Sequence, residues 1–151
     1  MKNKKIIIID DELLISSLIK ELLEGEDPDL EISEMVTDKQ EFLDLVSNHP
    51  FDAALIDISL GGREDGLDLL RILKEQGHKF PVVMLSAHDE ITYAAKCLKL
   101  GAAGYINKTH IPNDLPRGLK KVMKGELFVS GNEGEMILKK HMDTFNGSIL
   151  K

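Results

Sequence analysis

Side chains capable of phosphate and metal chemistry stand at or near the ends of four short apolar runs. They are three adjacent acids, a single acid, a hydroxyl and an ammonium: Asp10-Asp11-Glu12, Asp57, Ser86 and Lys108. Crowded carboxylates repel one another unless a cation neutralises them, and a hard divalent ion prefers oxygen ligands. Mg²⁺ fits best, because it takes one or two carboxylates, keeps several waters and accepts substrate phosphate. Together these groups are the residue types of a phosphoryl-transfer site.

Short apolar runs and amphipathic stretches alternate along the chain. The apolar runs have the length and composition of buried parallel strands, and the stretches between them have helical spacing. The expected strands lie near residues 5–9, 30–36, 53–57, 81–86 and 103–106, and the expected helices near 13–23, 38–48, 67–73, 89–98 and 113–124. Asp38 and Asp89 are the expected caps of two helices. Strict alternation predicts a parallel sheet with helices on both faces, and ligands then bind at the carboxyl ends of the strands.

Composition narrows the class of protein. The chain has 151 residues, 42% apolar and 30% charged, with a net charge of −7, which suits one compact domain. One cysteine, Cys97, excludes an internal disulfide and suits a reducing cytosol. Membrane spans need about 18–20 apolar residues, and no such run is present. The acidic balance argues against nucleic-acid binding by this chain alone. We therefore expect a soluble, cytoplasmic protein without a membrane partner.

The last 26 residues differ from the rest. We assign residues 1–125 to the main domain and residues 126–151 to a C-terminal extension. Five apolar residues of the extension fall roughly at helical spacing: Met136, Ile137, Leu138, Met142 and Phe145. A connector helix is therefore expected there, followed by a flexible linker at residues 145–148.

Four segments give the chain its resemblance to a known family. Residues 9–12, 56–57, 84–87 and 101–108 resemble those of the receiver domain of bacterial two-component response regulators, over about residues 4–125. Residues 105–108 and 125–130 resemble receivers of the NarL/LuxR type. The resemblance implies a flavodoxin-like (CheY-like) doubly wound fold with five parallel strands in the order 2-1-3-4-5.

The resemblance also implies a role for each acid. Asp57 is expected to accept a phosphoryl group from a sensor histidine kinase or a phosphorelay partner. Asp11 is expected to bind Mg²⁺ directly and Asp10 through water, with Asp57 and the Ser59 backbone carbonyl as further metal ligands. Carboxylates are known nucleophiles that form aspartyl phosphates, which agrees with these roles.

The remaining site residues are implied to respond to the phosphoryl group. Ser86 is expected to hydrogen-bond its oxygens, Lys108 to pair with them, and Tyr105 to act as an aromatic switch that follows Ser86. The chain departs from the family pattern in a loop after Asp57 that is one residue longer, and in having Gly61 and Thr109 where relatives commonly have proline.

We expect the switch to control an output, most simply transcription through a DNA-binding domain that this chain does not contain. A homodimer through the last helices is a possible part of that switch. The chain is not expected to be an enzyme, beyond catalysing its own phosphorylation and dephosphorylation. The alternative is a stand-alone receiver that acts through protein–protein interaction or as a phosphorelay intermediate.

Three rival functions share parts of this pattern. A flavodoxin-type protein needs a phosphate-binding loop after its first strand, where this chain has acids that would repel phosphate. An aspartate-nucleophile phosphatase has a second Asp two residues after the first, where this chain has Ser59. A degenerate receiver, which binds partners without phosphorylation, would lack some of the chemical groups that are present here.

Overall fold

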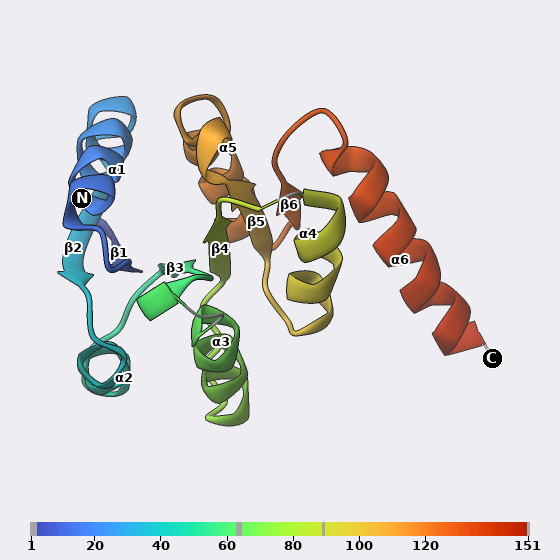
Figure 1. Cartoon of the computed structure of the whole chain (residues 1–151), viewed down its shortest axis with the longest axis horizontal. Helices are drawn as coiled ribbons and strands as arrows, with labels where there is room; N and C mark the ends of the chain where they lie inside the picture. The colour runs from blue at the N-terminus through green and yellow to red at the C-terminus, as the bar shows by residue number, and fades with distance from the viewer. Residues whose placement is uncertain (1–2, 63–64, 89, 151) are drawn as a thin grey trace.

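The computed structural model describes residues 3–62, 65–88 and 90–150. Within these ranges strands and helices alternate from the N-terminus onward (Figure 1). The strands are β1 (Lys4–Ile9), β2 (Leu30–Val36), β3 (Ala53–Asp57), β4 (Val82–Ser86), β5 (Gly104–Asn107) and β6 (Phe128–Val129). The α-helices are α1 (Leu13–Glu26), α2 (Lys39–Asn48), α3 (Asp65–Glu75), α4 (Glu90–Lys99), α5 (Ile111–Met123) and α6 (Gly134–Leu150). Two 3-10 helices, η1 (Leu60–Gly62) and η2 (Lys108–His110), lie in the loops after β3 and β5.

The strands form a parallel sheet in the order β2-β1-β3-β4-β5-β6. The expected α/β class and the order 2-1-3-4-5 are confirmed. The expected number of five strands is wrong, because β6 pairs with β5 at the far edge of the sheet. β6 is only two residues long, and two residues are too few to give an alternating pattern in the sequence.

Two hydrophobic layers cover the two faces of the sheet. Along β1 the side chains alternate between these layers, so Ile6 and Ile8 lie in one and Ile7 and Ile9 in the other. Helices α1 and α5 pack on the Ile6 face, and α2, α3 and α4 pack on the Ile7 face (Figure 1). A strand buried on both faces explains the continuous run of isoleucines. The expected helices on both faces are therefore present.

The expected helix caps have different outcomes. The Asp38 carboxylate accepts a hydrogen bond of 2.9 Å from the Glu41 N–H at the start of α2, as expected from the sequence. Asp89, the expected cap of α4, lies outside the described residues.

No helix in the described part of the chain is long and apolar enough to cross a membrane.

The segment after residue 125 contributes to the folded core. Phe128 and Val129 are 5% and 4% exposed, and the Phe128 ring lies under the guanidinium of Arg117, 5.0 Å from its centroid. A side chain at Gly118 would collide with this ring, since an added Cβ would lie 2.5 Å from it. The extension begins with a buried strand, while the proposed domain boundary at residue 125 stays a prediction.

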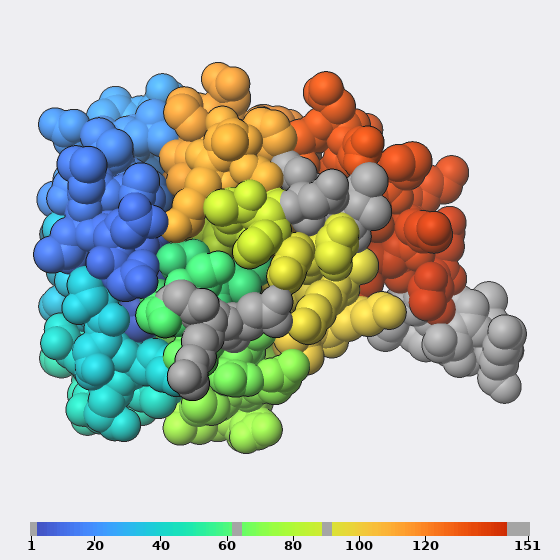
Figure 2. Space-filling model, viewed as in Figure 1, coloured from blue at the N-terminus to red at the C-terminus, as the bar shows by residue number. Residues whose placement is uncertain are grey.

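Helix α6 lies on the flank of the molecule beside α4 (Figure 2). Ile137 and Leu138 of α6 are half-buried and pack against the hydrophobic layer of the Ile7 face. The helix predicted from the apolar spacing is therefore present. The flexible linker expected at residues 145–148 is wrong, because these residues continue α6. A single glycine costs a helix only about 1 kcal/mol, so Gly147 does not end it.

We predict that Phe128→Ala lowers the free energy of unfolding by about 3 kcal/mol, because it removes a buried aromatic ring and leaves a cavity. Met136→Ala in α6 is the control, since this side chain is 61% exposed and its loss should change stability by less than about 0.5 kcal/mol. Urea denaturation of the full chain measures both. Equally small effects of the two substitutions would show that β6 is not part of the core.

Candidate functional site

Strand register brings the chemically active residues to one edge of the sheet. Ile9 of β1 lies opposite Ile56 of β3, so Asp10 and Asp57 follow at the same level. Asp57 in turn lies opposite Leu85 of β4, immediately before Ser86. Ser86 lies opposite Asn107 of β5, immediately before Lys108. The expected convergence of strand ends at the carboxyl edge is therefore present.

Lys108 is the cationic centre of this edge. Its Nζ lies 3.3 Å from Asp10 Oδ2, 3.4 Å from Asp57 Oδ2 and 3.6 Å from Glu12 Oε1. Burial alone lowers the pKa of the Lys108 ammonium, but the charges of the three carboxylates outweigh it and raise that pKa above its usual value. Lys108 therefore remains charged at neutral pH, and its charge offsets part of the repulsion among the acids.

Asp10 is the most constrained of the acids. Its side chain is fully buried, and Oδ1 accepts a hydrogen bond of 2.8 Å from the Glu12 N–H. Oδ2 has the Lys108 charge nearby but no hydrogen-bond partner among the described residues. Burial, reinforced by the charge of Asp57, raises the pKa of the Asp10 carboxyl from 3.8 to about 6, although the Glu12 N–H and Lys108 oppose this. The folded chain therefore disfavours the ionised form of the Asp10 carboxyl relative to the unfolded chain.

Asp57 lies beside Asp10 at the end of β3. It is 2% exposed, and its Oδ1 accepts a hydrogen bond of 3.2 Å from the Ser59 N–H. This bond leaves Oδ2 facing the Lys108 ammonium. Helix α3 begins close behind, because Gly66 lies so near that an added Cβ would be 2.1 Å from the Asp57 carbonyl oxygen. The backbone around Asp57 is therefore held by the strand on one side and by α3 on the other.

Asp11 and Glu12 complete the acidic group on its exposed side. Carboxylate oxygens of Asp10, Asp11 and Glu12 all lie within 4.8 Å of one another. Asp11 Oδ2 accepts a hydrogen bond of 3.2 Å from the N–H of Gly61. Gly61 has φ +62°, a left-handed conformation that proline cannot adopt, and proline has no N–H to donate. The departure at this position therefore adds a contact between the loop after β3 and Asp11.

The donor set fits Mg²⁺. All the groups are hard oxygens, and the buried Asp10 Oδ2 lacks a hydrogen-bond partner among the described residues, which is the condition that a bound cation would relieve. Asp10, Asp11 and Asp57 would hold the ion, either directly or through water. Ser59 lies two residues after Asp57 and its N–H donates to the Asp57 carboxylate, while the role of its carbonyl as a metal ligand stays a prediction.

The expected switch residues are linked through the backbone of one residue, His88. Ser86 is fully buried and its Oγ accepts a hydrogen bond of 2.9 Å from the His88 N–H. The hydroxyl of Tyr105, also fully buried, donates a bond of 2.7 Å to the His88 carbonyl. Two hydrogen bonds, one to the N–H and one to the carbonyl of His88, therefore connect Ser86 with Tyr105. The His88 ring stacks on the Tyr93 ring, with 4.5 Å between their centroids. Their roles as switch residues stay predictions.

Sequence reasoning missed Asn107. Its side chain bonds both to the His88 carbonyl and to Thr109, between the two groups expected to bind phosphate. A signal was available in the sequence, because Asn at a strand end commonly accepts a hydrogen bond from the backbone two residues later.

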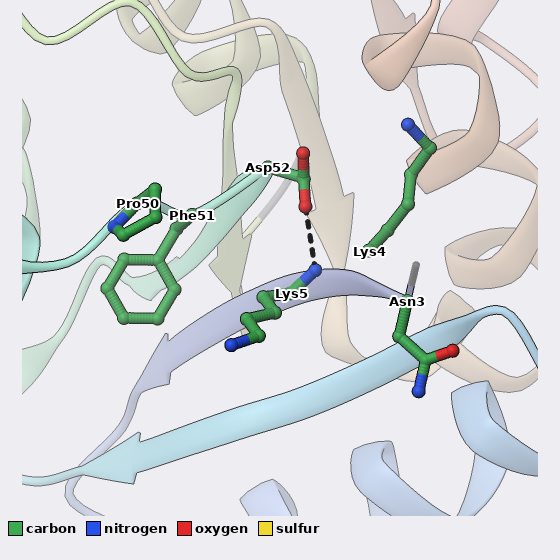
Figure 3. Close-up of a pocket in the computed structure, with 6 residues that line it drawn as sticks. All are labelled: Asn3, Lys4, Lys5, Pro50, Phe51 and Asp52. Carbon is green, nitrogen blue, oxygen red and sulfur yellow. Dashed lines mark hydrogen bonds between the residues drawn. The ribbon is translucent and has the colours of Figure 1, made fainter. Parts of the chain in front are cut away.

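The acidic edge is distinct from a hollow of about 280 Å³ at the opposite end of the strands (Figure 3). Lys4, Lys5, Pro50 and Phe51 line that hollow, and the Asp52 carboxylate in it already accepts a hydrogen bond of 2.8 Å from the Lys5 N–H. It lacks the clustered acids of the carboxyl edge.

Comparison with known proteins agrees with this geometry. The sequence-family model of the response regulator receiver domain matches residues 6–120. Fimbriae Z protein of Salmonella typhimurium is 27% identical over 128 residues, which cover 85% of this chain and 60% of that protein. Transcriptional regulatory protein DegU of Brevibacillus brevis is 28% identical over 142 residues, covering 94% of this chain and 59% of DegU. The chain thus spans about 60% of the length of these two relatives.

A solved structure supports the fold independently. The isolated REC domain of RcsB from Salmonella enterica serovar Typhimurium, determined in the presence of the phosphomimetic BeF3−, superposes with a TM-score of 0.76 at 22% identity. The match covers 85% of this chain and 94% of that domain. The resemblance to receivers of the NarL/LuxR type is confirmed by these comparisons.

We predict that Asp10→Asn raises the free energy of unfolding at pH 7 by about 1–3 kcal/mol without metal, because it removes a charge that the fold disfavours. A pKa raised from 3.8 to about 6 means that protonation of Asp10 stabilises the fold fully below about pH 3.8, and that this contribution is lost as the pH rises through 6. Urea denaturation at pH 7 without Mg²⁺ measures the change.

The exposed Asp29→Asn is the control and should leave stability unchanged. Added Mg²⁺ should raise the melting temperature of the wild type by more than that of Asp10→Asn. A lower free energy of unfolding for Asp10→Asn than for the wild type would contradict the conclusion that the fold disfavours the ionised Asp10 carboxylate.

Proposed function

The chain belongs to the response regulator receiver domain family, and we propose that it accepts a phosphoryl group on Asp57 from a sensor histidine kinase in a Mg²⁺-dependent reaction. The observation that carries the proposal is the arrangement around Lys108, whose ammonium lies 3.4 Å from Asp57 Oδ2 and 3.3 Å from Asp10 Oδ2. A carboxylate nucleophile beside a fixed cation, with further acids able to hold a metal, is what transfer of a phosphoryl group requires.

The residues of the chain would act on the transferred group by charge and position. Asp57 Oδ2 bonds to phosphorus as the phosphorus–nitrogen bond of the donor phosphohistidine breaks, and the leaving imidazole takes up a proton. Lys108 offsets the negative charge that spreads over the phosphoryl oxygens. Bound Mg²⁺ would supply further charge neutralisation beside Asp10 and Asp11. Ser86 offers a hydroxyl to the same oxygens once the group is in place.

The surface beside Asp57 supports a kinase that docks through one of its helices. Helix α1 begins directly after the acidic group, and Leu13, Leu14 and Leu18 on it are 55%, 73% and 53% exposed. Exposed leucines on one helix adjacent to a reactive site favour docking of an amphipathic helix from another protein. The exchange would take place in the cytoplasm, and the chain would act on no substrate other than its own Asp57.

Phosphorylation would change the loops that carry Ser86 and Tyr105. A phosphoryl group adds negative charge and acceptor oxygens, which would accept a hydrogen bond from the Ser86 hydroxyl and draw its Oγ away from the His88 N–H. The altered face includes α4 and α5, through which we propose a homodimer forms or separates. The name of DegU, a transcriptional regulatory protein, supports transcription as the output, through a DNA-binding domain outside the residues of this chain.

We predict that acetyl phosphate with Mg²⁺ adds one phosphate to the wild-type chain, and that Asp57→Asn adds none because an amide is not a nucleophile for phosphorus. Intact-mass spectrometry of the full chain measures the modification.

Asp52→Asn is a matched control, since Asp52 precedes the same strand β3 at the opposite end and should be phosphorylated normally on Asp57. Equal labelling of Asp57→Asn and the wild type would overturn the proposal, and so would a failure of the wild type to be labelled.

A further inference from the structure

We propose that Asn107 is a positioning residue for phosphoryl transfer, which holds Ser86 and Lys108 at a fixed separation across the site. The inference rests on the proposed function of Asp57. It comes from a buried side chain that joins the loop after β4 to the loop after β5, and from a pattern shared by four strand ends.

The amide nitrogen of Asn107 faces the loop after β4. Its Nδ2 donates a hydrogen bond of 2.8 Å to the His88 carbonyl, which also accepts the bond from the Tyr105 hydroxyl. The N–H of the same His88 donates to Ser86 Oγ. His88 is thus held on both sides of its backbone, and through it Asn107 fixes the peptide that binds the Ser86 hydroxyl.

The amide oxygen of Asn107 faces the other way, along the loop after β5. Its Oδ1 accepts hydrogen bonds from the Thr109 N–H at 2.9 Å and from Thr109 Oγ1 at 2.8 Å. Lys108 stands between these two residues, so its backbone is fixed from both ends at the start of η2. Thr109 replaces the proline common in relatives, and its N–H is available for this bond, whereas proline has no N–H.

The backbone of Asn107 is fixed as well. Its N–H donates a bond of 2.9 Å to Ser130 Oγ, and Ser130 is fully buried after β6. Asn107 itself is only 9% exposed, so its amide has little access to water and depends on these partners. An amide suits the position because it donates to one loop and accepts from the other. A carboxylate would leave the His88 carbonyl without this donor.

The same local bond recurs at each strand end that carries a site residue. At Asp10, Asp57, Ser86 and Asn107, the side chain accepts a hydrogen bond from the backbone N–H two residues later. Three of these four residues are expected to touch the metal or the phosphoryl group. Asn107 occupies the equivalent position on β5, where the reactive group is the next residue, Lys108. Its place in the pattern indicates that it orients the site without entering the reaction.

The test is a double-mutant cycle between Asn107→Ala and Lys108→Ala in the full chain, with acetyl phosphate and Mg²⁺ as the phosphoryl source. Asn107→Ala alone should lower the rate of Asp57 phosphorylation roughly tenfold, since a displacement of about 1 Å in a reacting group costs up to about 100-fold. In the Lys108→Ala background the same substitution should cause a clearly smaller fold-loss, because one of the two groups that Asn107 positions is gone and only Ser86 remains.

The control is Asn113→Ala, which alters an exposed amide on α5 and should leave the rate unchanged in both backgrounds. If Asn107→Ala does not fold, Thr109→Val replaces it in the cycle. That substitution removes one bond to Oδ1 from an exposed residue and should give a smaller loss that is also reduced without Lys108.

The outcomes separate the two proposals. A wild type that is not labelled overturns the proposed function and the role of Asn107 with it. A labelled wild type in which Asn107→Ala causes equal fold-losses with and without Lys108 overturns the positioning role alone, since a general disturbance of the fold acts in both backgrounds.

Discussion

Repulsion between two buried carboxylates is the constraint on which the rest of this structure depends. Asp10 and Asp57 are 0% and 2% exposed, and each lies within 3.4 Å of the same ammonium group. Unit charges about 4 Å apart interact by about 4 kcal/mol near a protein surface, so one lysine offsets part of the repulsion but leaves an excess of negative charge. In the proposed function, the same excess of negative charge would attract a divalent cation to Asp57. The same carboxylates therefore lower the stability of the fold and favour the proposed function.

The parallel sheet makes this arrangement possible. Parallel strands in register deliver their carboxyl ends to one edge, and each end is then closed by a side chain that bonds to the backbone two residues later. Such local bonds turn the chain sharply away from the sheet while keeping the side chain at the edge. Close approach at Gly66 lets α3 begin directly behind Asp57. The site is therefore built from short local turns on a rigid scaffold.

Much of this was predictable, and the exceptions have physical causes. The continuous apolar runs of the buried strands predicted a parallel sheet with Asp10, Asp57 and Lys108 at one edge, and the order 2-1-3-4-5 followed from the family resemblance. β6 was missed because two residues, Phe128 and Val129, carry no periodicity. The role of Asn107 was missed because it depends on a contact with His88, 19 residues away along the chain. Tertiary contacts of this kind leave no mark in local spacing.

The unequal edges of the sheet have a consequence for how copies of this chain can associate. Exposed edge strands offer unpaired backbone groups to other chains, and very short strands, charges and bulges limit this. At one edge β6 presents only two residues. At the other, β2 carries Glu31 and Glu34, and its register with β1 shifts between Ile6 and Ile7. Neither edge is a good template for strand addition, so aggregation of copies of this chain through their sheet edges is disfavoured.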